Sequence, residues 1–292
     1  MSKDISLNYN NGKSDKLPIK QFSLKMFCAN PSIVMIAKRG SGKSWVIRAV
    51  LHHYKHIPAG IIISKTEKMD PFYSKFFPDS YIYYGYKSEI IKKVLIRQKM
   101  MADKLERGKK IDPRCYIIMD DVLGEKKKWN NDELVHELLF DGRHYKVTYI
   151  LALQYPLGMS PDLRSNFDYI FLLATDNVGN MKRMYENYAG MIPNFDSFRQ
   201  IYKQLTSNHG CMVIANRGAE DSFFSKIYHY TAPDLTDSKI TFGCKQFRDY
   251  HNNNYNKQWS KKVQKLDVDE YMIKKKKDRS NIVVDKIITE QN

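Results

Sequence analysis

The sequence predicts an α/β protein built around a mostly parallel β-sheet that is covered by helices on both faces. Short, continuously apolar runs alternate with stretches of helical periodicity between about residues 31 and 235. A glycine-rich turn ending in Lys43-Ser44 separates the first apolar run from a helix, and a later apolar run ends in Asp120-Asp121. Continuously apolar strands separated by helices are typical of parallel sheets, whose ligands bind at the carboxyl ends of the strands.

Each predicted element has its own local signal. Apolar runs predict buried strands, and spacing of three to four residues between apolar positions predicts helices. The strands are expected over residues 32–37, 60–64, 115–121, 147–153, 169–174 and 210–215, with an alternating edge strand over 222–230. The helices are expected over residues 42–54, 87–107, 132–140, 177–188 and 196–205.

Composition divides the chain into three parts. Residues 1–30 are polar and are predicted to form a flexible N-terminal arm, whereas residues 31–235 carry the strand-helix rhythm of a folded domain. Residues 236–292 lose that rhythm and become rich in lysine, so they are predicted to be a basic, partly disordered tail, or an arm that touches DNA or another protein.

The charge and cysteine content limit the possible partners and compartments. The formal net charge is +16, which favours a polyanionic partner such as nucleic acid over a merely solvated basic surface. The four cysteines form no C-x-x-C pair, and no apolar run approaches the ~18 residues of a membrane span. We therefore expect a soluble, intracellular protein without a membrane span, unless it is carried inside a particle.

The turn after the first strand has the composition of a phosphate-binding loop. Glycines let the backbone approach phosphate oxygens, the lysine reaches the β- and γ-phosphates, and the serine hydroxyl is a ligand for Mg²⁺. The usual pattern is G-x-x-x-x-G-K-[ST], and this chain has alanine at the first glycine. The predicted ATP-binding loop consists of Ala37, Lys38, Arg39, Gly40, Ser41, Gly42, Lys43 and Ser44.

Polar residues at two further strand ends complete the predicted site. Asp120 is expected to hold Mg²⁺ together with Ser44, and Asp121 to act as the general base toward the attacking water. Asp121 could instead only cap the following loop. Gln154 ends the fourth strand and is expected to sense the γ-phosphate, although a plain turn into Tyr155 is the alternative.

Three arginines are candidates for a positive group supplied to the γ-phosphate by a neighbouring subunit. Arg143 lies in a Gly-Arg-His turn, and Arg164 lies in a Leu-Arg-Ser-Asn segment. Arg183 is the weaker candidate. A surface charge without a catalytic role is the alternative for each of them.

In order along the chain, these motifs resemble those of the poxvirus-type genome-packaging ATPases of large nucleocytoplasmic DNA viruses, within the FtsK–HerA superfamily. The resemblance spans about residues 30 to 230. It implies an ATPase of the additional-strand type with sheet order 5-1-4-3-2 and edge strands added C-terminally. It also implies a ring-shaped homo-oligomer that moves double-stranded DNA into a preformed capsid, with Arg143 and then Arg164 as the groups acting in trans.

The resemblance further implies a capsid portal or vertex protein as partner and the viral assembly site in the host cytoplasm, or the virion, as location. Two other functions remain open on the residues alone. One is a different DNA-translocating or helicase-like NTPase, and the other is a nucleotide-binding switch with little hydrolysis. A lysine-bearing loop at 124–129 (GEKKKW) is a candidate for the DNA-facing surface, or an exposed loop without a role.

Overall fold

The computed structural model describes residues 5–8, 14–218, 223–238 and 241–256. The chain divides into two compact units, Met1–His251 and Asn252–Asn292. The fold and the site described below belong to the first unit. Within the described residues, no helix is both long and apolar enough to cross a lipid bilayer.

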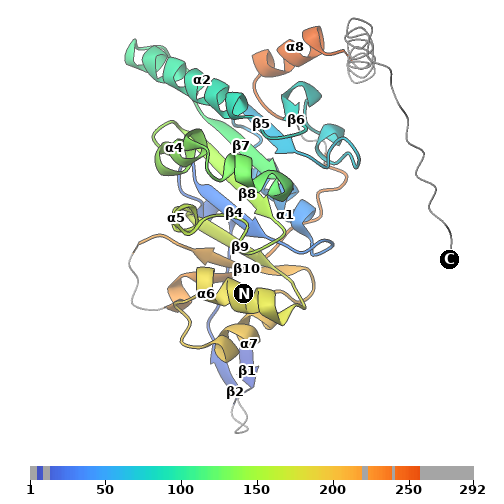
Figure 1. The fold of residues 1–292 in the computed structure, drawn as a ribbon, viewed down its shortest axis with the longest axis vertical. Helices are drawn as coiled ribbons and strands as arrows, with labels where there is room; N and C mark the ends of the chain where they lie inside the picture. Colours follow the sequence, from blue (N-terminus) through green and yellow to red (C-terminus); the bar gives the residue numbers. More distant parts are fainter. Residues whose placement is uncertain (1–4, 9–13, 219–222, 239–240, 257–292) are drawn as a thin grey trace, which may run out of the picture. The chain divides into compact units, whose positions relative to one another are not determined.

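A nine-stranded sheet forms the centre of this unit (Figure 1). From one edge to the other, its strands are β3 (Lys20–Gln21), β11 (Ile227–Thr231), β10 (Gly210–Ala215), β9 (Tyr169–Leu173), β4 (Ser32–Ile36), β8 (Val147–Leu153), β7 (Cys115–Asp120), β5 (Ala59–Ser64) and β6 (Ile82–Tyr83). The six strands from β9 to β6 are parallel, while β10 runs antiparallel to both β9 and β11. A separate hairpin pairs β1 (Ile5–Asn8) with β2 (Ser14–Leu17).

Helices cover both faces of the sheet, and adjacent strand residues point into different cores. In β4, for example, Val34 and Ile36 belong to one apolar cluster, whereas Ile33 and Met35 belong to the other. Every residue of β7 and of β8 is buried, which is the burial expected of central parallel strands. The sequence pattern is continuously apolar because both sides of these strands need apolar neighbours.

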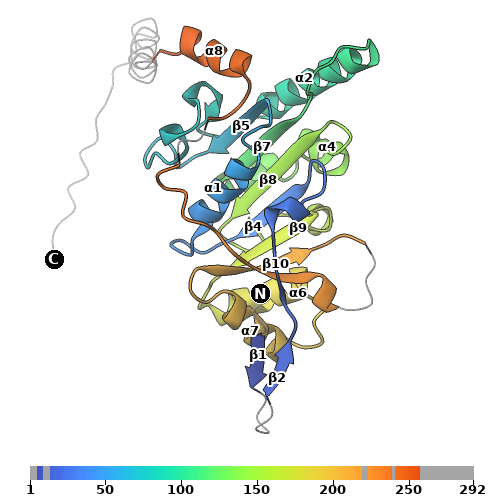
Figure 2. The same cartoon turned by 180° about the vertical axis from the view of Figure 1, so that it is seen from behind.

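The first face carries most of the helices and the second carries α1 (Figures 1 and 2). The first-face helices are α2 (Ser88–Glu106), α3 (Lys126–Trp129), α4 (Glu133–Asp141), α5 (Pro161–Arg164), α6 (Val178–Tyr188) and α7 (Phe195–Leu205). The second-face helices are α1 (Lys43–His53) and α8 (Lys245–Asn254). Single 3-10 turns are η1 (Leu24–Met26), η2 (Tyr73–Lys75), η3 (Asp79–Tyr81), η4 (Leu123–Glu125) and η5 (Phe223–Ser225).

The predicted sheet order 5-1-4-3-2 is confirmed, because β9, β4, β8, β7 and β5 lie side by side in that sequence. The antiparallel strand pair β10–β11 extends the β9 edge, as expected for C-terminal additions. The predicted edge strand at 222–230 is observed as β11, but β11 is not the outermost strand, because the short β3 pairs with it.

Both predicted domain boundaries need correction. The N-terminal boundary at residue 31 is too late, because Ile19 and Phe22 are buried and β3 joins the sheet. The C-terminal boundary at residue 235 is too early, because Phe242 and Phe247 are buried against the second face. Both boundaries were misplaced because these mostly polar segments contain a few apolar side chains that are buried in the domain. The lysine-rich part of the predicted tail, residues 257–292, lies outside the described residues.

A strap formed by residues 232–238 and 241–244 follows β11 along the α1 face (Figure 2). Its end is anchored where the Cys244 backbone N–H donates to the carbonyl oxygen of Pro58 at 2.8 Å. Phe242 packs against Phe76 and Phe77, with ring centroids 5.9 and 5.6 Å away. The strap therefore belongs to the folded domain.

Candidate active site

The predicted phosphate loop connects β4 to α1 at the carboxyl edge of the sheet. Gly40 and Gly42 adopt φ angles of +75° and +94°, a backbone region that favours glycine. Gly42 caps α1 without a side-chain hydrogen bond, so the first N–H groups of the helix face the loop and can bind an anion. The backbone conformation of the loop thus explains why glycine occupies both positions.

Ala37 departs from the usual motif at a position that requires no glycine. It is buried, and its N–H donates to the carbonyl oxygen of Leu153 at 2.9 Å. Ala37 therefore extends the pairing of β4 with β8. Ala37 is not among the residues with positive φ, so an alanine fits this position without backbone strain.

Lys43, at the start of α1, joins two carboxylates. Its Nζ donates to Asp120 Oδ1 at 2.6 Å and to Asp121 Oδ1 at 2.8 Å. All three side chains are at most 15% exposed, so the ions interact in a poorly screened environment. The structure therefore brings together the lysine and the two acids that the sequence predicted to share a site.

The three charges shift one another's pKa values. Burial alone lowers the pKa of Lys43, but the two carboxylates outweigh it and raise that pKa, so the lysine keeps its charge. Burial raises the pKa of Asp120, and the charge of Lys43 limits the rise. Partial burial likewise acts to raise the pKa of Asp121, but Lys43 and hydrogen bonds from Gln154 and Thr66 outweigh it and lower that pKa.

Two further side chains hold Asp121 in place. Gln154, just beyond β8, donates from Nε2 to Asp121 Oδ1, and Thr66, just beyond β5, donates from Oγ1 to Oδ2 at 3.1 Å. Asp121 itself has a φ of +53°, an uncommon conformation for a residue other than glycine. Gln154, predicted as a sensor of the γ-phosphate, thus contacts the predicted base, and Thr66 is a neighbour that sequence reasoning missed.

A buried tyrosine holds the other acid. Tyr73, in η2, donates its hydroxyl hydrogen to Asp120 Oδ2 at 2.8 Å. The turn that carries Tyr73 is fixed by Glu67, whose carboxylate accepts from the backbone N–H groups of residues 72, 73 and 74. Sequence reasoning missed Tyr73, since a short turn between strands has no periodic signal.

Lys43 and Asp121 line a cavity of about 1030 Å³. The phosphate loop, Thr66, Asp121 and Gln154 line part of it, and Asn208, His209, Thr231 and Asp234 line another part. The volume is sufficient for a nucleoside triphosphate with its hydration. The Ser44 hydroxyl and the Asp120 carboxylate supply the hard oxygen atoms that Mg²⁺ prefers, and Mg²⁺ in such sites takes its remaining ligands from water and phosphate.

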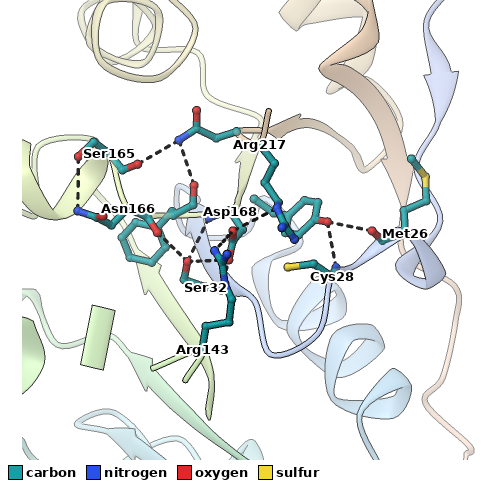
Figure 3. A network of polar contacts seen from close by, with 11 residues as sticks. Met26, Cys28, Ser32, Arg143, Ser165, Asn166, Asp168 and Arg217 are labelled. Carbon is teal, nitrogen blue, oxygen red and sulfur yellow. Dashed lines mark hydrogen bonds and ion pairs between the residues drawn. The ribbon is translucent and has the colours of Figure 1, made fainter. Parts of the chain in front are cut away.

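Neither favoured arginine lines this cavity. Arg143 precedes β8 and therefore lies at the amino edge of the sheet, opposite the phosphate loop. Its guanidinium bonds Asp168 Oδ1 at 2.8 Å, and 55% of the side chain is exposed (Figure 3). Arg164 ends α5, and its charge limits the rise that burial causes in the pKa of Tyr188. Within one chain, then, neither arginine can act on the nucleotide of its own site.

The amino-edge cluster around Asp168 includes residues that the sequence did not single out. Asp168 is buried, and its Oδ2 accepts from the backbone N–H and the hydroxyl of Ser32 at 2.9 and 3.1 Å. Arg217 Nε lies 3.6 Å from Asp168 Oδ1, so two guanidinium groups share one carboxylate (Figure 3). The cluster carries an excess of positive charge at the surface.

Two other sequence candidates have local roles. Arg183 lies over the ring of Tyr155, 5.6 Å from its centroid. The lysine-bearing segment at 124–129 was predicted as a loop, but it forms η4 and α3. Trp129 is fully buried there, and its indole N–H donates to the carbonyl oxygen of Val122. These contacts pack the segment against the domain. Lys126 donates to the carbonyl oxygen of Leu157, so this lysine supports the domain as well.

Comparison with known protein families gives a match over most of this chain. The family model of the poxvirus A32 protein matches residues 19–261. Protein L437 of Acanthamoeba polyphaga mimivirus is 45% identical over 259 residues, covering 87% of this chain and 88% of the relative. Protein 075L of Invertebrate iridescent virus 6 is 32% identical over 262 residues, covering 83% and 98%.

A solved structure shares the fold. The genome packaging NTPase B204 from Sulfolobus turreted icosahedral virus 2, in complex with sulfate, aligns with a TM-score of 0.50. Its sequence identity is 16%, and the alignment covers 71% of this chain and 99% of that one.

Proposed function

This chain belongs to the poxvirus A32 protein family, and we propose that it is an ATP-driven motor that moves double-stranded viral DNA into a preformed capsid. The main support for the proposal is the pair of salt bridges from Lys43 to Asp120 and Asp121, beside a cavity large enough for a nucleotide. The shared fold with a protein described as a genome packaging NTPase supports the same function.

ATP binding changes the partners of Lys43. Its ammonium group is bonded to two carboxylates, and the β- and γ-phosphates of ATP offer a stronger concentration of negative charge. When Lys43 moves to the phosphates, Asp121 loses the charge that lowers its pKa. The bound nucleotide thus makes Asp121 a better proton acceptor at the moment when a base is required.

Hydrolysis then follows from the positions of Asp121 and Gln154. Asp121 accepts a proton from a water molecule, the water oxygen bonds to the γ-phosphorus, and the bond from that phosphorus to the ADP oxygen breaks. Gln154 fixes the base through its hydrogen bond, and in the proposed cycle it senses loss of the γ-phosphate. Ser44 and Asp120 would hold Mg²⁺, which would supply positive charge for the phosphate oxygens.

A neighbouring subunit completes the proposed site. Arg143 is the first candidate for the trans-acting group because it is exposed at the sheet edge opposite the phosphate loop of its own chain. In a ring of identical subunits, that edge of one subunit can meet the nucleotide of the next. Arg164 is the second candidate. A ring with a basic channel would follow duplex DNA through its phosphates without reading its sequence.

Assembly at a capsid vertex or portal protein in the host cytoplasm, or within the virion, completes the proposal. Hydrolysis of ATP with and without duplex DNA tests it. We expect duplex DNA to stimulate hydrolysis by the wild type and Lys43→Ala to remove the activity under both conditions. Equal hydrolysis with and without DNA would refute the motor, and full activity of Lys43→Ala would refute the assigned site.

Mixed rings test the role of Arg143. Arg143→Ala and Lys43→Ala subunits are each expected to be inactive alone, because one lacks the trans group and the other lacks the phosphate-binding lysine. When the two variants are mixed, some interfaces combine an intact Lys43 with an intact Arg143, so part of the activity returns. A mixture as inactive as its components would show that Arg143 does not act across the interface.

A further inference from the structure

The cavity extends to both sides of the phosphate loop, and the two sides have different chemistry. The loop follows β4, which lies between β8 and β9. Thr66, Asp121 and Gln154 follow strands on the β8 side. His209 and Asp234 also line the cavity, but they belong to the β10–β11 side.

Strand directions bring those last residues to the same edge as the phosphate loop. β10 runs antiparallel to β9, with Cys211 opposite Leu173, so β10 begins where β9 ends. β11 is antiparallel to β10, with Gly210 opposite Thr231, so β11 ends at the same edge. The turn before β10 and the strap after β11 therefore meet at the cavity.

The groups that would act on the γ-phosphate fix the direction of the nucleotide. Asp121 and Gln154 lie on the β8 side, so the γ-phosphate must point there when Lys43 holds the triphosphate. The opposite end of an extended nucleotide then lies on the β10–β11 side. Resting on the function proposed above, we infer that His209 and Asp234 form the nucleoside subsite, with the His209 ring against the base and the Asp234 carboxylate accepting from a hydroxyl or amino group of the nucleoside.

Asp234 can accept a hydrogen bond from a nucleoside, but its charge would repel a phosphate group. Its Oδ1 accepts from the backbone N–H of Thr236 at 2.9 Å, and hydrogen bonds from Thr236 lower the pKa of Asp234. It is therefore a fixed anion on the cavity wall. A fixed anion is repelled by phosphate oxygens, whereas the hydroxyl and amino groups of a nucleoside are donors that it can accept.

His209 is presented by an unusual turn. Asn208 and His209 have φ angles of +49° and +60°, and this pair of left-handed residues reverses the chain between α7 and β10. Left-handed residues other than glycine concentrate at functional positions. Trp45, in the first turn of α1, also lines the cavity, with 46% of its surface exposed. Trp45 is therefore a natural reporter of occupancy.

Binding of ATP compared with inorganic tripolyphosphate tests the inference. Tripolyphosphate lacks a nucleoside, so only ATP can contact the subsite. We would measure dissociation constants by calorimetry for the wild type, His209→Asn and Asp234→Ala, with Asp237→Ala as a matched control on the same strap. Asparagine removes the ring at residue 209 and tolerates its positive φ.

Each subsite variant should weaken ATP binding by about 3- to 10-fold, the loss of one hydrogen bond or packing contact, and leave tripolyphosphate binding unchanged. Asp237→Ala should match the wild type for both ligands. Unchanged ATP binding in both variants, or equal weakening for ATP and tripolyphosphate, would overturn the subsite. Trp45 emission should change with ATP more than with tripolyphosphate, and Trp45→Phe should remove that difference.

The failure of this inference and that of the motor are distinguishable. A wild-type protein whose hydrolysis ignores duplex DNA would refute the motor, while the difference between ATP and tripolyphosphate in the variants would still support the subsite. Conversely, DNA-stimulated hydrolysis with unchanged ATP binding in His209→Asn and Asp234→Ala would refute the subsite alone.

Discussion

The hydrogen bond from Tyr73 to Asp120 supports a carboxylate of the proposed Mg²⁺ site. Both residues are buried, with 1% and 6% of their surface exposed, and the oxygen atoms lie 2.8 Å apart. Tyr73→Phe keeps the ring and removes only the donor. The Asp120 carboxylate would then keep Lys43 but lose its partner at Oδ2.

A hydrogen bond to a charged group contributes about 1.5–3 kcal/mol to stability, and we expect Tyr73→Phe to lower the free energy of unfolding by that amount. With a urea dependence of about 2 kcal/mol per molar, a loss of 2 kcal/mol lowers the unfolding midpoint by roughly 1 M. Urea titration without nucleotide at pH 7, followed by circular dichroism, measures this shift.

Tyr116→Phe is the matched control. Tyr116 is equally buried and belongs to the same apolar cluster, but within the described residues its hydroxyl has no hydrogen-bond partner. Removing that hydroxyl should change stability by less than about 0.5 kcal/mol, or increase it. Equal effects of the two substitutions, or no measurable effect of Tyr73→Phe, would refute the role given to the Tyr73–Asp120 bond.

Three further outcomes are expected. Lys43→Ala should lower the rate of ATP hydrolysis by about 10²–10³-fold, because one preorganised charge is removed; a rate within threefold of the wild type, measured by phosphate release, would contradict this. Asp168→Asn should destabilise the domain by about 1–3 kcal/mol in urea titration, because the amide cannot accept from both Ser32 and Arg143; unchanged stability would show that the cluster contributes nothing. Asp121→Asn should be less stable than the wild type at pH 7. Because the folded-state pKa of Asp121 lies below 3.8, its contribution is present above that pH and is lost as the pH falls through the folded pKa, so the difference between the two proteins in urea titrations should shrink as the pH is lowered below 3.8.

The sheet and the main acids were predictable from sequence because they depend on strong local signals. The apolar runs that form β7 and β8 predict buried strands. The end of β7 in turn fixes the positions of Asp120 and Asp121. The lysine and the acids therefore meet as predicted. The strand order was implied by family resemblance rather than by the pattern of any one segment.

The remaining parts of the site depend on contacts that no local sequence pattern predicts. Tyr73 reaches Asp120 only because Glu67 folds the intervening turn through three backbone hydrogen bonds. Asp234 reaches the cavity only because the chain after β11 runs along the α1 face. Both contacts join segments far apart in the chain, and neither segment has helical or strand periodicity.

In the proposed motor, ATP hydrolysis at Lys43 and Asp121 drives movement along duplex DNA. A triplex-displacement assay tests it most directly: a third strand is annealed to one end of a duplex, and its release by the protein is followed over time. We expect release that requires ATP, that begins later when the triplex is placed further from the entry end, and that is absent with Lys43→Ala. Robust DNA-stimulated ATP hydrolysis without release of the third strand would contradict it.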